Sequence, residues 1–229
     1  MKLYSHGKKV RELVIDHDEV RQLVRGSGLE PLLTCSYELV DKGLVSAFVE
    51  RWHRDTSSFH LPVGEMTITL DDVSSLLHIP ITGAFLTITV FDKAQAAELL
   101  RELLGVPVAE SRLEMDTVTR ASTVRYSWLL QIYHDRCQQQ RWDEAARALL
   151  LHLVGCTLFS DKSSLAVSVA YLECFRDLQS CGAYSWGAAA LAHLYDHLRH
   201  ASLHHTKGIS GYLTLIQVLY NFYIIYLFL

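Results

Sequence analysis

Hydrophobic residues repeat at helical spacing along most of the chain. Apolar positions three and four residues apart form one face of a helix, and a glycine or proline beyond the last of them ends it. This spacing predicts helices over residues 10–24, 39–52, 71–78, 92–104, 124–137, 142–159, 167–178 and 186–201. No internal repeat or Gly/Ser-rich linker interrupts them, so the pattern indicates a single, mainly α multi-helix domain.

One stretch changes its period from that of a helix to that of a strand. Met66, Ile68 and Leu70 alternate with two threonines, as residues of a half-buried strand do. Gly64 lies just before them and permits a tight turn after the preceding apolar run. The sequence therefore predicts a small β-hairpin near residues 58–70.

Local polar signals set the ends of several helices. Thr69 and Asp72 have the spacing of a capping box, so a helix should begin next to them and stop before Pro80. Asp92 can cap the following helix, which Gly105 should end.

The segments between these helices are assigned from their composition. Residues 84–90 are predicted to be extended, and the polar residues 108–119 are predicted to form a loop. Ser185 is expected to cap the helix that starts at Trp186.

Composition and charge narrow the class of protein. Half of the 229 residues are apolar and a fifth are charged, which is typical of a globular protein. The net charge of −4 argues against nucleic-acid binding through bulk electrostatics. The five cysteines contain no Cys-x-x-Cys pair, so we expect buried thiols in a reducing compartment rather than disulfides or a zinc site. Residues 1–10 lack the apolar core of a signal peptide, which favours an intracellular protein.

Three multi-residue blocks follow one another along the chain. They are residues 44–52 with 59–73, which contain ERW, FHLP, GE and TITL, then residues 153–163, and then residues 184–192 with 211–217. Together they resemble the plant mobile domain, a helical domain also labelled aminotransferase-like. The family includes proteins similar to MAINTENANCE OF MERISTEMS and to the long form of plant phosphatase seven, and many domains carried by transposons.

The resemblance implies a biological role rather than a chemical one. It implies a nuclear protein that acts in meristem maintenance, genome stability and transposon silencing through protein or chromatin interaction. It implies no catalytic residue and no cofactor; the partners are unidentified proteins, chromatin-associated ones included, and direct nucleic-acid binding is left open. Two alternatives are a transposon-derived domain that assists nucleic-acid handling and a non-functional truncated fragment.

Four residues in these blocks are candidates for a structural or interaction role. Trp52 and Trp186 adjoin apolar helix faces, which favours core anchoring over the alternative of a partner-binding hot spot. Arg51 and Glu65 are placed to form a charge pair across the junction of helix and hairpin.

Motifs of enzymes do not assemble in this sequence. The chain has neither the Gly-Asp nor the Asn-His dipeptides with which metal-dependent phosphatases hold two metals. Lys162 fits a solvated turn better than a pyridoxal-phosphate site, and the first glycine of a nucleophile elbow around Ser185 is missing. We therefore predict a non-enzymatic protein without catalytic, cofactor-binding or metal-binding residues.

A row of histidines is the strongest remaining chemical signal. His193, His197, His200 and His204 lie along one helical face. Such a row could bind zinc or copper, but a solvated or partner-facing polar stripe is the favoured interpretation.

The family likeness is expected to end at Gln217. Residues 1–217 would then be the first part of a C-terminally truncated plant mobile domain, and residues 218–229 an apolar tail outside the family. Residues 212–229 carry no charge and are near the lower limit for a membrane span. A buried or aberrant apolar segment is favoured over a membrane anchor, because three polar residues lower the hydropathy.

Overall fold

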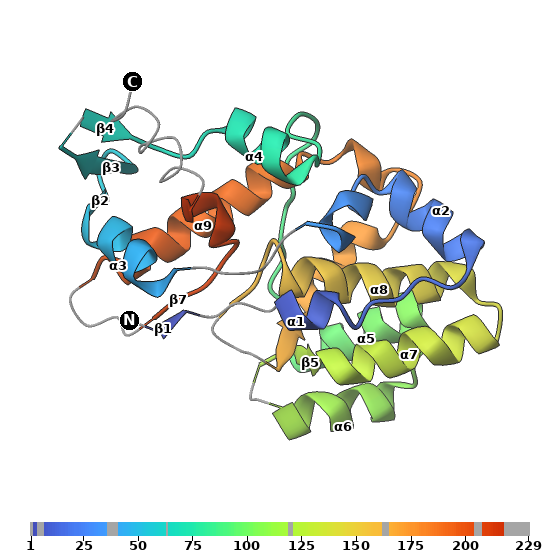
Figure 1. Ribbon diagram of the computed structural model, residues 1–229. Coiled ribbons are helices and arrows are strands. Elements are labelled where there is room, and N and C mark those ends of the chain that lie inside the picture. The colour runs from blue at the N-terminus through green and yellow to red at the C-terminus, as the bar shows by residue number, and fades with distance from the viewer. Residues whose placement is uncertain are drawn as a thin grey trace.

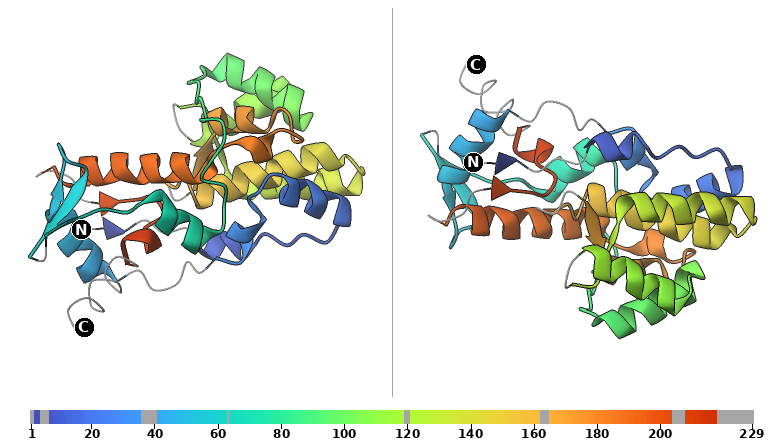
Figure 2. Two further views of the ribbon diagram at one scale, coloured as in Figure 1. Left: turned by 90° about the horizontal axis from the view of Figure 1, so that it is seen from above. Right: turned by 90° about the horizontal axis from the view of Figure 1, so that it is seen from below.

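The structure is a computed structural model, and it describes residues 2–3, 7–35, 41–62, 64–118, 121–161, 165–203 and 208–217. Most of these residues lie in helices, and the strands are short, which confirms the mainly α fold. Figures 1 and 2 show two groups of elements: α2 and α5 to α8 form one, and α3, α9 and a small sheet form the other.

The described residues contain both α-helices and 3₁₀ turns. The α-helices are α1 (Gly7–Val10), α2 (Asp18–Gly26), α3 (Lys42–Glu50), α4 (Leu70–Leu77), α5 (Lys93–Leu104), α6 (Val108–Val118), α7 (Tyr126–Gln138), α8 (Trp142–Cys156) and α9 (Trp186–Ala201). Three 3₁₀ turns are η1 (Glu30–Leu33), η2 (Val169–Phe175) and η3 (Cys181–Ala183).

The strands form three small sheets. They are β1 (Lys2–Leu3) parallel to β7 (Gly208–Ile209), the antiparallel β2 (Trp52–His53), β3 (Ser58–Leu61) and β4 (Gly64–Met66), and β5 (Thr123–Arg125) antiparallel to β6 (Ala166–Ser168). None of these sheets is large enough to form a layer, so the core lies between helices.

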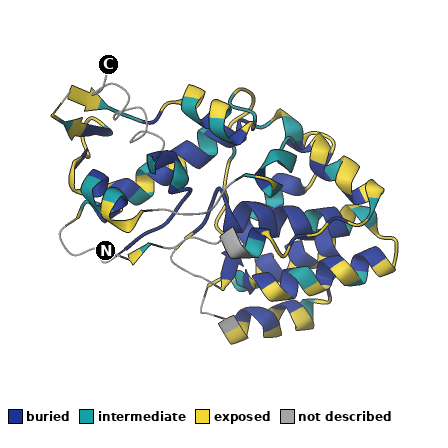
Figure 3. Ribbon diagram, viewed as in Figure 1, coloured by how far each residue is buried: buried dark blue, intermediate teal, exposed yellow. Residues whose placement is uncertain are grey.

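Helix α8 is the centre of the larger group. Every residue from Ala148 to Cys156 is buried, and Figure 3 shows α8 almost wholly in the colour of buried residues. Its neighbours are α7, α2, α5 and η2, which cover it on different sides. A helix that is apolar around its whole circumference requires such a surround.

The predicted helix ends are confirmed where the signal is local. Thr69 and Asp72 form a complete capping box at the start of α4, and Asp92 and Gln95 form another at the start of α5. Gly105 ends α5 in the left-handed conformation, with φ 65°. These contacts join residues at most four positions apart.

The predicted hairpin is present, but it is shorter than expected and has a third strand. β3 and β4 pair across the turn, and β2 adds to the outer edge of β3. Leu70 does not continue the strand, because the capping box starts α4 at that residue. The side chain of Leu70 is consequently exposed rather than part of a buried strand face.

The loop predicted over residues 108–119 is wrong, because α6 occupies Val108–Val118. Its polar sequence hid one buried face, formed by Ser111, Glu114 and Met115. Glu114 accepts hydrogen bonds from the backbone and guanidinium of Arg125, the closest at 2.5 Å. The buried carboxylate of Glu114, paired with the exposed Arg125 of β5, thus lies on the face where an apolar stripe usually identifies a helix.

The helix predicted over residues 167–178 is also wrong. Its start belongs to β6, where Val167 pairs with Val124 of β5, and the 3₁₀ turn η2 follows. Most side chains of this stretch are buried, so their spacing does not separate a helix from a compact irregular segment.

The helices predicted over residues 10–24 and 39–52 differ in their extent. The first is divided into α1 and α2, because His17 adopts an extended conformation and Arg21 reaches back to the carbonyl of Ile15. The second is α3, which begins at Lys42 and ends at Glu50. Residues 36–40 lie outside the described residues.

Gly187 allows the start of α9 to contact α4 and the chain after it. Its amide donates to the carbonyl of Pro80 at 2.8 Å. A Cβ at this position would lie 2.7 Å from Ile81 Cγ2 and 3.0 Å from Val73 Cγ1. The absence of a side chain therefore sets the distance between these two helices.

The substitution Gly187→Ala should lower the free energy of unfolding by about 1–3 kcal/mol, because the added methyl group overpacks this contact. Gly26→Ala is the matched control, since no atom lies within 4 Å of its Cβ position. Urea denaturation of both variants tests this, and equal stability of Gly187→Ala and the wild type would contradict it.

Candidate functional site

Trp52 anchors the small sheet against α9. Its indole is buried and meets the rings of Phe59 and Tyr195 edge to face, with centroids 4.8 and 5.1 Å apart. Phe48 of α3 adds a further edge contact to Phe59 at 5.1 Å. This burial places Trp52 in the core.

Tyr195 completes this junction with hydrogen bonds. Its hydroxyl donates to the carbonyl of Ile68 at 2.6 Å and lies 2.5 Å from the hydroxyl of Thr67. Thr67 in turn donates to the carbonyl of Ser57. The chain that leaves β4 is thereby held to α9, more than 120 positions away.

The expected charge pair between Arg51 and Glu65 does not form. The register of β3 and β4 places Glu65 opposite His60, and the His60 Nε2 to Glu65 Oε1 distance is 2.9 Å. Arg51 instead donates to the carbonyl of Ala47, one turn earlier in α3. His53 stacks on His60 at 4.4 Å, so the outer face of the sheet carries a polar cluster.

Trp186 is fully buried at the start of α9. Its indole N–H donates to the carbonyl of Cys181 at 2.9 Å, and its ring stacks on Phe175 at 5.4 Å. Ser185 precedes the helix as predicted, but its hydroxyl donates to the carbonyl of Ile81 rather than capping. Both side chains therefore serve packing between segments.

The histidine face of α9 is not a uniformly solvated stripe. Burial lowers the pKa of His193, whose ring lies 3.2 Å from the carbonyl oxygen of Ser160 and 4.4 Å from the ring of His197. His197 contacts the hydroxyl of Ser210 at 2.9 Å, whereas His200 is exposed. His204 lies outside the described residues, among which no cluster of three or more metal-ligating side chains occurs.

The expectation of buried thiols is confirmed. Cys137, Cys156, Cys174 and Cys181 are buried and Cys35 is half-buried, and all five are free. Burial raises the pKa of Cys174 to about 12 and that of Cys181 to about 11.

Buried charged side chains in the group formed by α2 and α5 to α8 bind helix ends and neighbouring strands. Arg136 of α7 donates to the carbonyl of Leu104 at 2.8 Å and to that of Gly105 at 3.1 Å, and it lies 3.0 Å from Glu144. These carbonyls end α5 and lack partners within that helix. Arg136 is thus a cap supplied by another helix.

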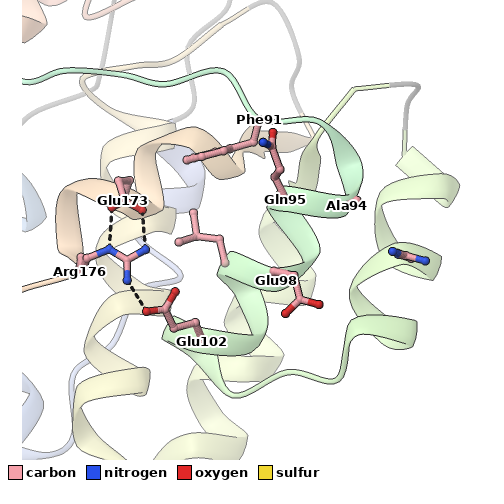
Figure 4. A pocket seen from close by; sticks show the side chains of 9 residues that line it. Phe91, Ala94, Gln95, Glu98, Glu102, Glu173 and Arg176 are labelled. Carbon is pink, nitrogen blue, oxygen red and sulfur yellow. Dashed lines mark hydrogen bonds and ion pairs between the residues drawn. The ribbon is translucent and has the colours of Figure 1, made fainter.

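A surface pocket of about 460 Å³ lies between α5, α6 and η2. Figure 4 shows Arg176 held by Glu173 and Glu102, with Phe91 and Gln95 on the opposite side. Sequence reasoning missed these residues, because Glu102 and Arg176 are far apart in the chain and belong to no motif. The pocket combines paired charges with an apolar wall and contains no unpaired group of perturbed pKa.

His152 is a buried histidine that belongs to no sequence motif, so sequence reasoning missed it as well. It lies within the apolar centre of α8, 5.0 Å from the ring of Tyr126. Burial, assisted by the nearby charge of Lys9, lowers the pKa of His152 to about 4. The ring is therefore neutral in the folded protein at pH 7.

The contacts described above define the class of protein. The protein is a helical domain in which buried aromatic residues, arginines and tyrosines join segments that are distant in sequence. No helix within the described ranges is long and apolar enough to cross a membrane.

Comparison with known proteins identifies the family. Residues 30–226 match the plant mobile domain, so the chain belongs to the plant mobile domain family. The match extends past Gln217, at which the family likeness was expected to end, and residues 218–229 lie outside the described residues.

Three relatives from Arabidopsis thaliana illustrate the similarity. Protein MAIN-LIKE 1 is 37% identical over 87% of this chain and 39% of its own length. Protein MAINTENANCE OF MERISTEMS is 36% identical, over 78% of this chain and 36% of its own length. The serine/threonine-protein phosphatase 7 long form homolog is 34% identical, over 83% of this chain and 14% of its own length.

The chain spans between 32% and 39% of the length of the first three curated relatives it matches. No solved structure matches it.

The pKa of His152 makes stability depend on pH. The unfolded histidine has a pKa of about 6.5, so the unfolded chain binds a proton before the folded one does. The contribution of a neutral His152 is complete above pH 6.5, and about 3 kcal/mol is lost as the pH falls to about 4.

His152→Leu should therefore weaken the loss of stability between pH 7 and pH 5, measured as free energies of unfolding in urea. His134→Leu is the control, because His134 is an exposed histidine of the adjacent α7. The prediction is wrong if both variants retain the pH dependence of the wild type.

Proposed function

We propose that the chain acts without catalysis, through contacts with other proteins, in a nuclear pathway of meristem maintenance, genome stability and transposon silencing. Membership of the plant mobile domain family and similarity to Protein MAINTENANCE OF MERISTEMS and Protein MAIN-LIKE 1 support the pathway. The relatives are longer, so the proposal for this chain concerns the domain that they share with it.

The use of the buried polar groups supports the non-catalytic part of the proposal. Arg136 binds the end of α5, Glu114 holds Arg125, and Tyr126 donates to the carbonyl of Gly155 at 2.7 Å. Catalysis requires groups of perturbed pKa that converge on a cavity accessible to substrate. His152 has a perturbed pKa, but it is enclosed in the core of α8.

Nucleic-acid handling is the second candidate function, because two arginines, which can bind phosphate groups, line the surface pocket. Arg112 and Arg176 line this pocket together with Glu98, Glu102 and Glu173. A phosphate backbone is attracted by a concentrated basic face, and this pocket has mixed charge. The arrangement favours protein contacts over phosphate contacts.

Tagged full-length chain expressed in meristem tissue should accumulate in nuclei and co-purify with a reproducible set of proteins. Imaging and mass spectrometry of the purified material measure these two properties, with the tag alone as the control. Accumulation outside the nucleus would refute the localisation, and the absence of specific partners would refute the interaction role.

The purified chain should not bind duplex DNA or RNA saturably at concentrations up to about 10 μM in 0.15 M salt, because its pocket lacks excess positive charge. Fluorescence anisotropy with labelled 30-base-pair duplexes measures this. Saturable binding that weakens steeply with added salt would support the nucleic-acid alternative, and the slope would count the phosphates contacted.

A further inference from the structure

The chain between α4 and α5 contains an open segment, residues 85–90, whose backbone has no hydrogen-bond partner among the described residues. Ala84 forms an isolated bridge with Tyr184, in which its amide donates to the carbonyl of Ala183 at 2.9 Å. In the part of the chain that the structure describes, no hydrogen bond involves the peptide groups of residues 85–90. Figures 1 and 2 show this run as a long trace without helix or strand.

The side chains of this segment are those of a strand, and several of them are exposed. Phe85 is 82% exposed, Ile88 39% and Val90 89%. Aromatic and β-branched residues favour strands, and Pro and Gly are absent from the run. An unpaired, apolar strand edge is a template for pairing with another strand.

The sequence of the segment is almost the same from either end. Residues 85–91 read Phe-Leu-Thr-Ile-Thr-Val-Phe, so Ile88 is the centre of a near palindrome. Only the Leu86 and Val90 positions differ, and both are branched aliphatic residues. Leu86 and Phe91 also pack on the core, which holds the segment near both ends.

We propose that residues 85–91 pair with the same residues of a second copy of this chain, antiparallel and centred on Ile88. Two-fold symmetry then places each residue opposite its counterpart in the palindrome. The resulting cross-strand pairs are Phe85 with Phe91, Leu86 with Val90, Thr87 with Thr89, and Ile88 with Ile88.

This register gives the side chains favourable cross-strand pairs and gives the backbone hydrogen-bond partners. Aromatic, aliphatic and Thr–Thr pairs directly opposite each other stabilise antiparallel strands. Leu86, Ile88 and Val90 lie on one face of the paired strands, and the threonines lie between the phenylalanines on the other. Pairing also supplies partners for peptide groups that have none in the single chain.

A second copy fits this edge better than an unrelated strand does. Any strand can satisfy the backbone, but only an antiparallel copy in this register places like side chains together along all seven residues. The interface is short, so the dimer should be weak and should depend on protein concentration. The segment of residues 85–91 shares only Phe91 with the pocket between α5, α6 and η2.

Charge substitutions at the two exposed threonines test the register. Thr87→Lys/Thr89→Glu places opposite charges across both symmetric pairs, whereas Thr87→Lys/Thr89→Lys places like charges there. Both threonines are exposed, so neither variant disturbs the core. Sedimentation velocity of the full chain from about 1 to 200 μM measures the dimer.

The wild type and the Lys/Glu variant should dimerise, and the Lys/Lys variant should dimerise at least tenfold more weakly. A monomeric wild type at the highest concentration, or equal dimerisation of all three proteins, would overturn the proposal. Capture of an unrelated strand by a chain that stays monomeric would also overturn it.

Cross-linking locates the two-fold axis independently. Directly opposed residues have Cα atoms about 4.5–5.5 Å apart, which suits a disulfide. On mild oxidation, Ile88→Cys should form covalent dimers at least tenfold faster than Leu113→Cys, an exposed position on α6. Equal rates would contradict pairing at Ile88, and the wild type reports any contribution of the native thiols.

Discussion

The burial of residues 148–156 of α8 is the constraint on which the rest of the domain depends. No residue between Ala148 and Cys156 faces solvent, so α2, α5, α7 and η2 must all cover the helix. Gly155 lets β6 approach, because a Cβ there would lie 2.4 Å from Val167 Cγ2. The same apolar surround keeps His152 neutral. This helix thus contacts most of its group and holds a histidine whose pKa is lowered by burial.

Polar side chains form hydrogen bonds between elements of the fold that the apolar core around α8 does not hold together. Arg136 caps α5 from α7, and Tyr195 of α9 holds the chain that leaves the small sheet. Each of these groups has a partner far away in sequence, so the fold depends on buried hydrogen bonds as well as on apolar area. Arginine and tyrosine here join segments of the chain that are distant in sequence.

Two surface features remain available for partners. The pocket beside α5 has paired charges around an apolar wall, and in the described part of the chain no hydrogen bond involves the peptide groups of residues 85–90. Phe91 belongs to both features, because it lines the pocket and ends the segment. The relatives that match this chain are longer and are similar to it only over part of their length.

The sequence by itself determined the family, the mainly α class and those helix ends whose contacts are local. The capping boxes formed by Thr69 with Asp72 and by Asp92 with Gln95 join residues three positions apart, so the local sequence suffices to predict these helix starts. Only the tertiary structure decided that α6 is a helix, that β6 and η2 replace one, and that Glu65 pairs with His60. These outcomes depend on burial and on strand register between distant segments, which local periodicity does not encode.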